Sequence, residues 1–187
     1  MEAGARGENR RLEALETYTC RDNLIITGLP VTSYSEIAAS SRPENRDDQN
    51  SEALETAVIE LFNDRLGLLI RKDHISIAHR LSRKRGSHLT SDTHQTADTS
   101  LLTIVKFANR KAREAVYAAR RKLRSVSGPR IFINEDLCKP TADLYRRARQ
   151  LVRERSLHSA WTSSCTVFVK ESAEARPRKV LTVTELP

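Results

Sequence analysis

The sequence predicts an α+β protein with two folded parts: a domain with the element order βαββαβ, followed by a small α+β C-terminal domain. Short β-branched runs, typical of strands, alternate with longer stretches in which apolar residues recur every three or four positions, as on one helix face. Gly, Pro and polar segments separate these stretches. The length of 187 residues is enough for two small domains.

Residues 1–22 are polar and charged, and we expect a short helical stub here. Leu12 and Leu15 fall on one helical face, and Tyr18 lies one turn further on. Two leucines are fewer than the roughly three or four heptads that predict a coiled coil. The stub is therefore either the end of a coiled coil or a frayed helix.

The first domain is predicted over residues 23–136. Its first strand is the apolar run 23–30, and the polar segment 31–51 that follows is expected to form a long loop. Ser51 is the expected N-cap of the first helix, which ends at Gly67. An apolar stripe marks the buried face of this helix: Leu54, Val58, Leu61, Phe62 and Leu66.

Two further predicted strands flank a second polar loop, which spans residues 82–100. Residues 74–81 alternate between apolar and polar side chains, which predicts a half-buried strand. Residues 101–107 form an apolar, β-branched run and predict the third strand. The loop begins with three consecutive basic residues: Arg83, Lys84 and Arg85.

A basic helix and a fourth strand complete the first domain. Asn109 is the expected N-cap of the helix, which runs to Leu123 and ends before a Ser-Gly-Pro break. Residues 130–134 predict the fourth strand. The helix carries a narrow apolar stripe: Ala112, Val116, Ala119 and Leu123. The resulting βαββαβ order is the ferredoxin-like arrangement.

The C-terminal domain is predicted over residues 137–187. Pro140 suits the first turn of its helix. The apolar stripe of that helix consists of Leu144, Ala148, Leu151 and Val152. Three short strands are expected over residues 159–162, 166–170 and 179–183. Trp161 and Phe168 are expected to fill the core of this small domain.

Positive charge is concentrated in the second half of the chain. Residues 1–100 carry 13 basic and 16 acidic side chains, whereas residues 101–187 carry 19 basic and 8 acidic side chains. A folded region with a net charge of +11 repels itself unless a polyanion relieves the field. The distribution therefore favours nucleic acid as a partner, and an anionic membrane surface less strongly.

The basic faces of the two later helices are the strongest functional signal. The ordinary interpretation of a charged helix face is solvation. Here few acids lie four positions away, and Arg, whose planar fork suits phosphate, outnumbers Lys. The run at 83–85 is equally typical of a nuclear import signal. The predicted nucleic-acid-binding residues are Arg83, Lys84, Arg85, Lys106, Arg110, Lys111, Arg113, Arg130, Arg146, Arg147, Arg149 and Arg153.

Several classes of function lack their sequence signatures. No apolar run approaches the roughly 18 residues of a membrane span, and the N-terminus has no apolar signal-peptide region. Cys20, Cys138 and Cys165 match neither a disulfide framework nor a zinc spacing, and a reducing compartment is expected. No nucleophile, phosphate-loop or paired-carboxylate motif is present. We expect no enzyme, no metal and no cofactor.

The predicted ferredoxin-like domain resembles an RNA recognition motif (RRM). In an RRM the first and third strands carry aromatic residues on which bases stack. Here Ile25, Leu102 and Ile104 occupy those positions, so the sheet face is aliphatic. Either another element covers this face, or it is a β surface merely inherited from the fold. The alternative function is a protein-interaction module, in which this aromatic-poor RRM sheet face binds a partner helix.

In three ordered stretches the chain resembles the first-open-reading-frame proteins of LINE-type (non-LTR) retrotransposons, over about residues 12–187. Residues 12–30 are similar to the coiled-coil exit into the first RRM strand. Residues 104–107 and the basic helix after them are similar to the third strand and second helix. The third stretch is similar to the link into that family's C-terminal domain. It consists of residues 131–137, the Arg-rich helix that follows them, and residues 160–162 and 167–170.

The resemblance implies a trimeric coiled coil, an RRM and a C-terminal domain that together bind single-stranded RNA, and ssDNA, with little sequence preference. It implies a nucleic-acid chaperone that coats the RNA of a transposable element in a cytoplasmic or nuclear ribonucleoprotein. In the family, RNA lies between the RRM and the C-terminal domain, and an Arg pair there matches Arg146-Arg147. This chain departs from the family pattern in having almost no coiled coil.

Overall fold

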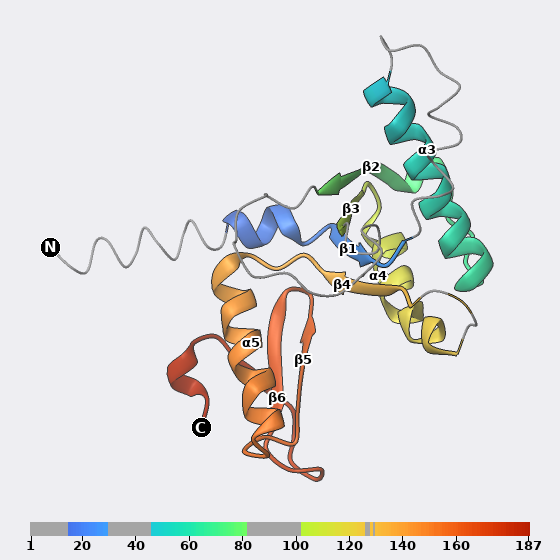
Figure 1. The fold of residues 1–187 in the computed structure, drawn as a ribbon. Coiled ribbons are helices and arrows are strands. Elements are labelled where there is room, and N and C mark those ends of the chain that lie inside the picture. Colours follow the sequence, from blue (N-terminus) through green and yellow to red (C-terminus); the bar gives the residue numbers. More distant parts are fainter. Residues whose placement is uncertain (1–14, 30–45, 82–101, 126–127, 129) are drawn as a thin grey trace, which may run out of the picture. The chain divides into compact units, whose positions relative to one another are not determined.

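The computed structural model of the chain describes residues 15–29, 46–81, 102–125, 128 and 130–187. These residues form two compact units (Figure 1). The central unit comprises residues 22–134, and the terminal unit comprises residues 15–21 together with 135–187. Each unit combines an antiparallel sheet with helices, so the predicted α+β class is confirmed.

The sheet of the central unit has four strands: β1 (Asn23–Thr27), β2 (Ile75–Leu81), β3 (Leu102–Phe107) and β4 (Phe132–Glu135). Their spatial order is β2-β3-β1-β4, and β3 pairs antiparallel with both β1 and β2. Buried and more exposed positions alternate along β1 and β4. This period of two is expected when one face of a sheet lies in the core.

Helix α3 (Arg46–Glu60) continues into a π-helical turn over Leu61–Arg65. The apolar stripe predicted for it is confirmed, because all five of its side chains are buried. Gly67 ends the helix with a φ of +65°. The predicted N-cap is wrong, since Ser51 lies inside α3 and its hydroxyl donates to the Ala78 carbonyl at 3.3 Å. The residues before Ser51 are polar and have no apolar periodicity, so the sequence did not indicate that α3 begins at Arg46.

Helix α4 (Arg110–Ala119) is followed by a 3₁₀ turn, η4 (Arg120–Arg124). Asn109 is confirmed as the N-cap: its side-chain oxygen accepts hydrogen bonds from the backbone N–H groups of Lys111 at 2.9 Å and Ala112 at 3.4 Å. These bonds satisfy two of the donors that a helix start leaves open. The cap fixes where the basic helix begins.

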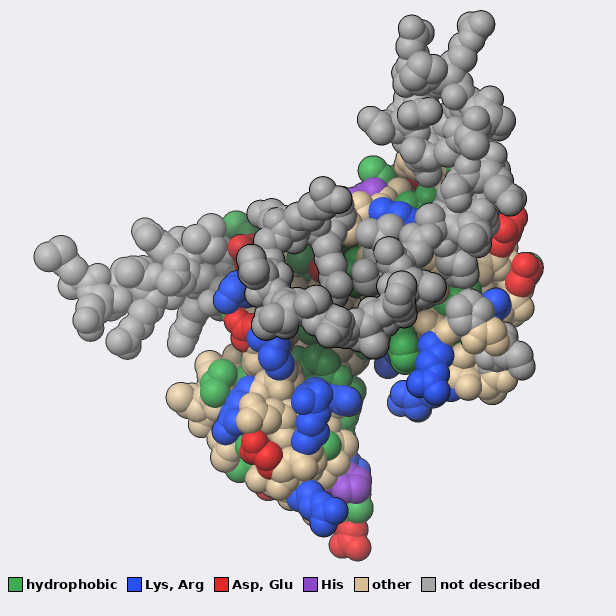
Figure 2. Space-filling view, in the orientation of Figure 1, with side chains coloured by type: hydrophobic (Ala, Val, Ile, Leu, Met, Phe, Trp, Pro, Cys, Tyr) green, Lys and Arg blue, Asp and Glu red, His purple; other side chains and the backbone are tan. Residues whose placement is uncertain are grey.

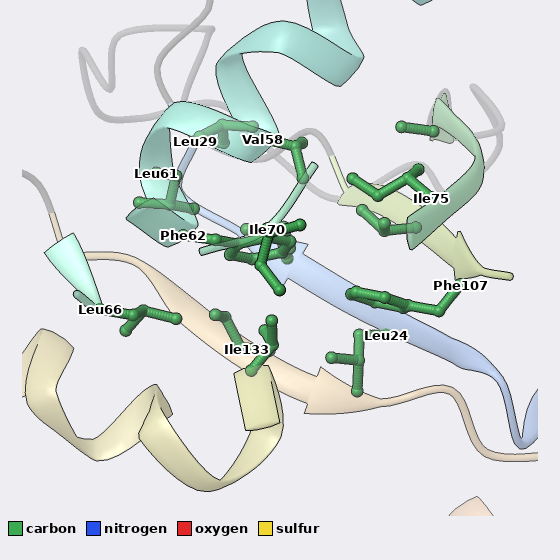
Figure 3. Packing of buried hydrophobic residues seen from close by; sticks show 14 of the residues in the cluster. Leu24, Leu29, Val58, Leu61, Phe62, Leu66, Ile70, Ile75, Phe107 and Ile133 are labelled. Atoms are coloured by element: carbon green, nitrogen blue, oxygen red, sulfur yellow. The ribbon is translucent and has the colours of Figure 1, made fainter. Parts of the chain in front are cut away.

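The core of the central unit lies between the helices and one face of the sheet (Figure 3). Phe62 of the π-helical turn stacks on Phe107 of β3, with ring centroids 6.0 Å apart. Leu24 and Ile133 enter from the sheet, and Val116 enters from α4. Because α3 and α4 share this core, both cover the same face of the sheet. The opposite face is the one that carries Ile25, Leu102 and Ile104.

In the terminal unit, α5 (Lys139–Arg153) packs against an antiparallel sheet of order β5-β6-β7. The strands are β5 (Ser159–Ser163), β6 (Thr166–Lys170) and β7 (Arg178–Val180). Pro140 lies in the first turn of α5, as predicted. Leu144, Ala148 and Leu151 of the predicted stripe are buried, and Val152 is partly buried against them. The side chains that meet this stripe are Leu157, Ala160, Val167, Val169 and Val180.

Trp161 and Phe168 do not belong to this core, so that prediction is wrong. They are cross-strand partners, and their rings stack with centroids 6.0 Å apart and planes 15° apart. Their neighbours Ala160 and Val167 are buried toward α5. Since successive side chains of a strand point to opposite faces, the aromatic pair lies on the sheet face turned away from α5.

Candidate nucleic-acid interface

Helix α5 carries a stripe of three exposed arginines: Arg146, Arg149 and Arg153. Their spacing of three and four residues places them on one side of the helix. That side is opposite the buried Ala148, whose neighbours fill the core. Arg147 is also exposed but lies on the flank of the helix. On the visible face of the terminal unit, Lys and Arg side chains form several patches (Figure 2).

One acid of α5 neutralises part of this basic helix. The Asp143 carboxylate accepts hydrogen bonds from Lys139 at 3.1 Å and from Arg146 at 2.6 Å. These two bonds hold the pKa of the Asp143 carboxyl below its usual value. Among the described residues, no acid forms an ion pair with Arg149 or Arg153. The C-terminal part of the stripe is therefore charged and available.

A second basic surface follows α4 and η4 of the central unit. Seven of the fifteen residues between Arg110 and Arg124 are Lys or Arg, and Glu114 is the one acid in that segment. Glu114 accepts a hydrogen bond from Arg110 at 3.0 Å. The side chains of Lys111, Arg121 and Arg124 are exposed. A segment with so few acids cannot neutralise itself.

Two further cations of this segment, which the site prediction did not include, are positioned by nearby groups. The Arg120 guanidinium lies over the Tyr117 ring, with its carbon 3.5 Å from the ring centroid. The Lys122 ammonium donates to the Leu66 carbonyl at 2.7 Å, at the end of the π-helical turn. Both residues belong to a sequence run of basic residues, which was the signal that could have added them to the predicted site.

Arg113 requires a correction. It was predicted to contact phosphate, but its side chain is only 3% exposed. It lies on the core side of α4 between the buried Ala112 and Val116, and its guanidinium carbon is 5.1 Å from the Tyr117 ring centroid. A side chain so deeply buried cannot meet a polyanion at the surface, so Arg113 is not part of the interface.

The remaining predicted residues differ in their placement. Lys106 is exposed on β3, and Arg130 is exposed just before β4. Arg83, Lys84 and Arg85 lie outside the described residues. The interface that the described residues provide therefore consists of two basic helices, one in each unit, with Lys106 and Arg130 as separate basic positions.

The central-sheet face turned away from α3 and α4 carries apolar side chains. Ile25 lies opposite Ile104, and Leu102 lies opposite Leu81. The three residues predicted for this face are half-buried. Sequence reasoning missed Phe132, an aromatic side chain of β4 that is 54% exposed. Its position between the buried Ile131 and Ile133 was the available signal, because alternation places it on the opposite face.

The cysteines do not have the features of nucleophiles. Cys138 and Cys165 are buried. Burial, and then the neighbouring Asp136 carboxylate, raise the pKa of the Cys20 thiol to about 11. A thiol with so high a pKa stays protonated at neutral pH, and the protonated form is not reactive.

No protein-family model matches the chain, and no curated protein matches it either. Within the described ranges, no group of three or more His, Cys, Asp or Glu side chains could hold a metal ion. No helix among the residues described is both long and apolar enough to span a membrane.

Proposed function

We propose that this protein binds single-stranded RNA, and ssDNA, through the exposed cations of its two basic helices, with little sequence preference. The observation that carries this proposal is the surplus of exposed guanidinium groups on α5 and on α4–η4 over the acids that could neutralise them. Phosphate is the partner that suits these groups, because the planar fork of Arg can donate two hydrogen bonds to one phosphate.

A nucleic-acid chaperone is the activity that such a surface suits best. Arg and Lys on exposed helix faces contact the sugar–phosphate chain and make few contacts with base edges, so they discriminate little between sequences. Contacts of this kind form and break rapidly, which lets strands exchange partners on the protein.

The proposal extends to the finer fold and the family. The strand order β2-β3-β1-β4, with two helices on one face, supports a ferredoxin-like, RRM-type central unit. Together with the basic helix of the terminal unit, it supports a relationship to the first-open-reading-frame proteins of LINE-type retrotransposons. A homo-oligomer and a cytoplasmic ribonucleoprotein belong to that proposal.

A second candidate function is a protein-interaction module. The observation that favours it is the apolar character of the central-sheet face turned away from α3 and α4, where Ile77 and Phe132 are 44% and 54% exposed. Exposed apolar patches of this kind often mark protein-binding sites. Under this alternative, removing arginines from α5 would leave partner binding intact.

Binding to oligonucleotides tests the first proposal. We expect the full chain to bind unrelated single strands of about 20 nucleotides, a length of one to a few site sizes, with affinities within about threefold of one another at low salt. Fluorescence anisotropy with labelled RNA and DNA of several compositions measures this. No binding at low salt, or binding to one sequence alone, would contradict the proposal.

A further inference from the structure

The terminal unit contains a cavity of about 690 Å³ that the basic helices do not explain. Its lining comes from the helical residues up to Arg21, from the start of α5, and from the segment between β7 and the 3₁₀ turn η5 (Val183–Glu185). All of these belong to the same compact unit. Ligand pockets in proteins commonly have volumes of about 300–1,000 Å³, so the cavity is large enough for a small organic group.

The rim of the cavity combines an aromatic ring, an aliphatic side chain and a cation. Tyr18 and Leu181 both line it, and they are 70% and 65% exposed. Arg21 lines it as well, and its Nε is buried without a hydrogen-bond partner among the described residues. An exposed ring beside a guanidinium whose Nε has no hydrogen-bond partner offers a stacking surface and an anion site together.

The wall formed by residues 181–185 is fixed in place. The Glu185 carboxylate accepts a hydrogen bond from the Leu181 backbone N–H at 3.0 Å and one from the Thr182 hydroxyl at 3.1 Å. Arg178 donates to the Glu185 carbonyl at 2.9 Å. These bonds hold the Glu185 carboxylate against its own turn, and among the described residues no ion pair joins it to Arg21.

The cavity lies near Arg147, the exposed arginine on the flank of α5. Pro140 and Leu144 line it, and Arg147 follows them on the same helix face at a spacing of four and three residues. The exposed guanidinium of Arg147 is therefore one turn beyond the cavity lining. A strand whose phosphates contact α5 could place a neighbouring nucleotide at the cavity.

We propose that the cavity receives one nucleotide of a bound single strand, with its base against Tyr18 and Leu181 and its phosphate on Arg21. This inference rests on the proposed function. It assigns base stacking to the terminal unit. In an RRM, by contrast, bases stack on aromatic side chains of the four-stranded sheet. The mixed lining suits a nucleobase, which has an apolar face and a polar edge, and the cation suits the phosphate attached to it.

Paired substitutions test this assignment in the full chain. Tyr18→Ala is expected to weaken binding of an oligonucleotide of about 20 residues about tenfold, whereas Tyr18→Phe, which keeps the ring, should stay within about twofold of wild type. Arg21→Ala should make the log–log salt slope shallower by about 0.7 per lost phosphate contact, and Arg21→Lys should retain the slope. Arg176→Ala removes an exposed arginine that does not line the cavity and should change neither value.

Photocrosslinking provides a readout that does not depend on affinity. With a 4-thiouridine oligonucleotide we expect crosslinks in the peptide that contains Tyr18 or in the one that contains Leu181. If Tyr18→Ala binds as wild type does and the crosslinks map only to α4 and α5, the inference is overturned while the proposed function stands; the apolar rim would then suit a protein ligand. If the wild-type protein binds no oligonucleotide, the proposed function itself fails.

Discussion

Replacing Arg146, Arg149 and Arg153 together by Gln is expected to weaken single-strand RNA binding about a hundredfold at low salt. The three side chains lie on one face of α5, and two of them have no acidic partner among the described residues. If each contact with phosphate contributes about 1 kcal/mol, three contacts correspond to roughly two orders of magnitude in the dissociation constant. Electrophoretic mobility shift or anisotropy titrations measure the change.

A matched triple variant separates the position of these charges from their number. Arg155, Arg176 and Lys179 are exposed in the same terminal unit but lie outside the stripe, and replacing all three by Gln removes the same net charge. This control is expected to lose no more than about fivefold, the effect of long-range charge alone. Equal losses in the two variants would contradict a defined basic face. No loss in either would favour the protein-interaction module.

Gly28→Ala is expected to lower the free energy of unfolding by about 3 kcal/mol or more, because the new alanine would both adopt a left-handed backbone conformation and clash with a neighbouring segment. Gly28 has a φ of +81°, and a Cβ added there would lie 2.2 Å from the Arg130 carbonyl oxygen. This close approach joins the end of β1 to the residues that enter β4. An added methyl group must therefore push the two segments apart.

Gly67→Ala is the matched control for this steric term. Gly67 has a φ of +65°, but the nearest atom to an added Cβ is the flexible Lys122 ammonium at 3.8 Å. Only the cost of a left-handed alanine remains, about 1–2 kcal/mol. Urea unfolding followed by circular dichroism compares the two variants. Equal destabilisation would mean that the contact between Gly28 and Arg130 contributes nothing to the central unit.

The sequence predicted the helices whose apolar stripes are continuous. The stripe from Leu54 to Leu66 and the stripe of α5 are buried as expected, because a spacing of three and four residues leaves one helix face apolar. The start of α3 could not be predicted, since its first residues are polar on every side. Ser51 is a good N-cap residue in isolation, but its hydroxyl serves the Ala78 carbonyl instead.

Strand faces were harder to predict than strands. Alternation along the strands places Trp161 and Phe168 on the sheet face opposite that of their neighbours, but it does not say which face α5 covers. The large size of the two aromatic side chains suggested that their face was the buried one, whereas α5 covers the other face. In β2 the register shifts between Ile75 and Ile77, so these two isoleucines do not share a face although they are two residues apart. A β-bulge of this kind depends on the partner strand and leaves no clear mark in one sequence.

The same contrast applies to the candidate site: the exposed helix positions could be predicted, whereas the packing between distant segments could not. Arginines at the outer positions of α5 are exposed as the helical pattern required. Arg113 is buried because α4 packs more of its circumference than its narrow apolar stripe indicated. The cavity in the terminal unit could not be predicted, because it joins Thr17, Tyr18 and Arg21 to residues at least 117 positions later in the chain.

The salt dependence of wild-type binding tests the central claim most directly, namely that exposed cations of α5 and α4–η4 hold a sugar–phosphate chain. For single strands, the logarithm of the binding constant falls with the logarithm of salt concentration by about 0.7 per neutralised phosphate. With about five contacts we expect a slope near −3.5, measured by anisotropy over a series of salt concentrations. A slope between zero and about −1 would contradict the claim, because it would leave at most one phosphate neutralised.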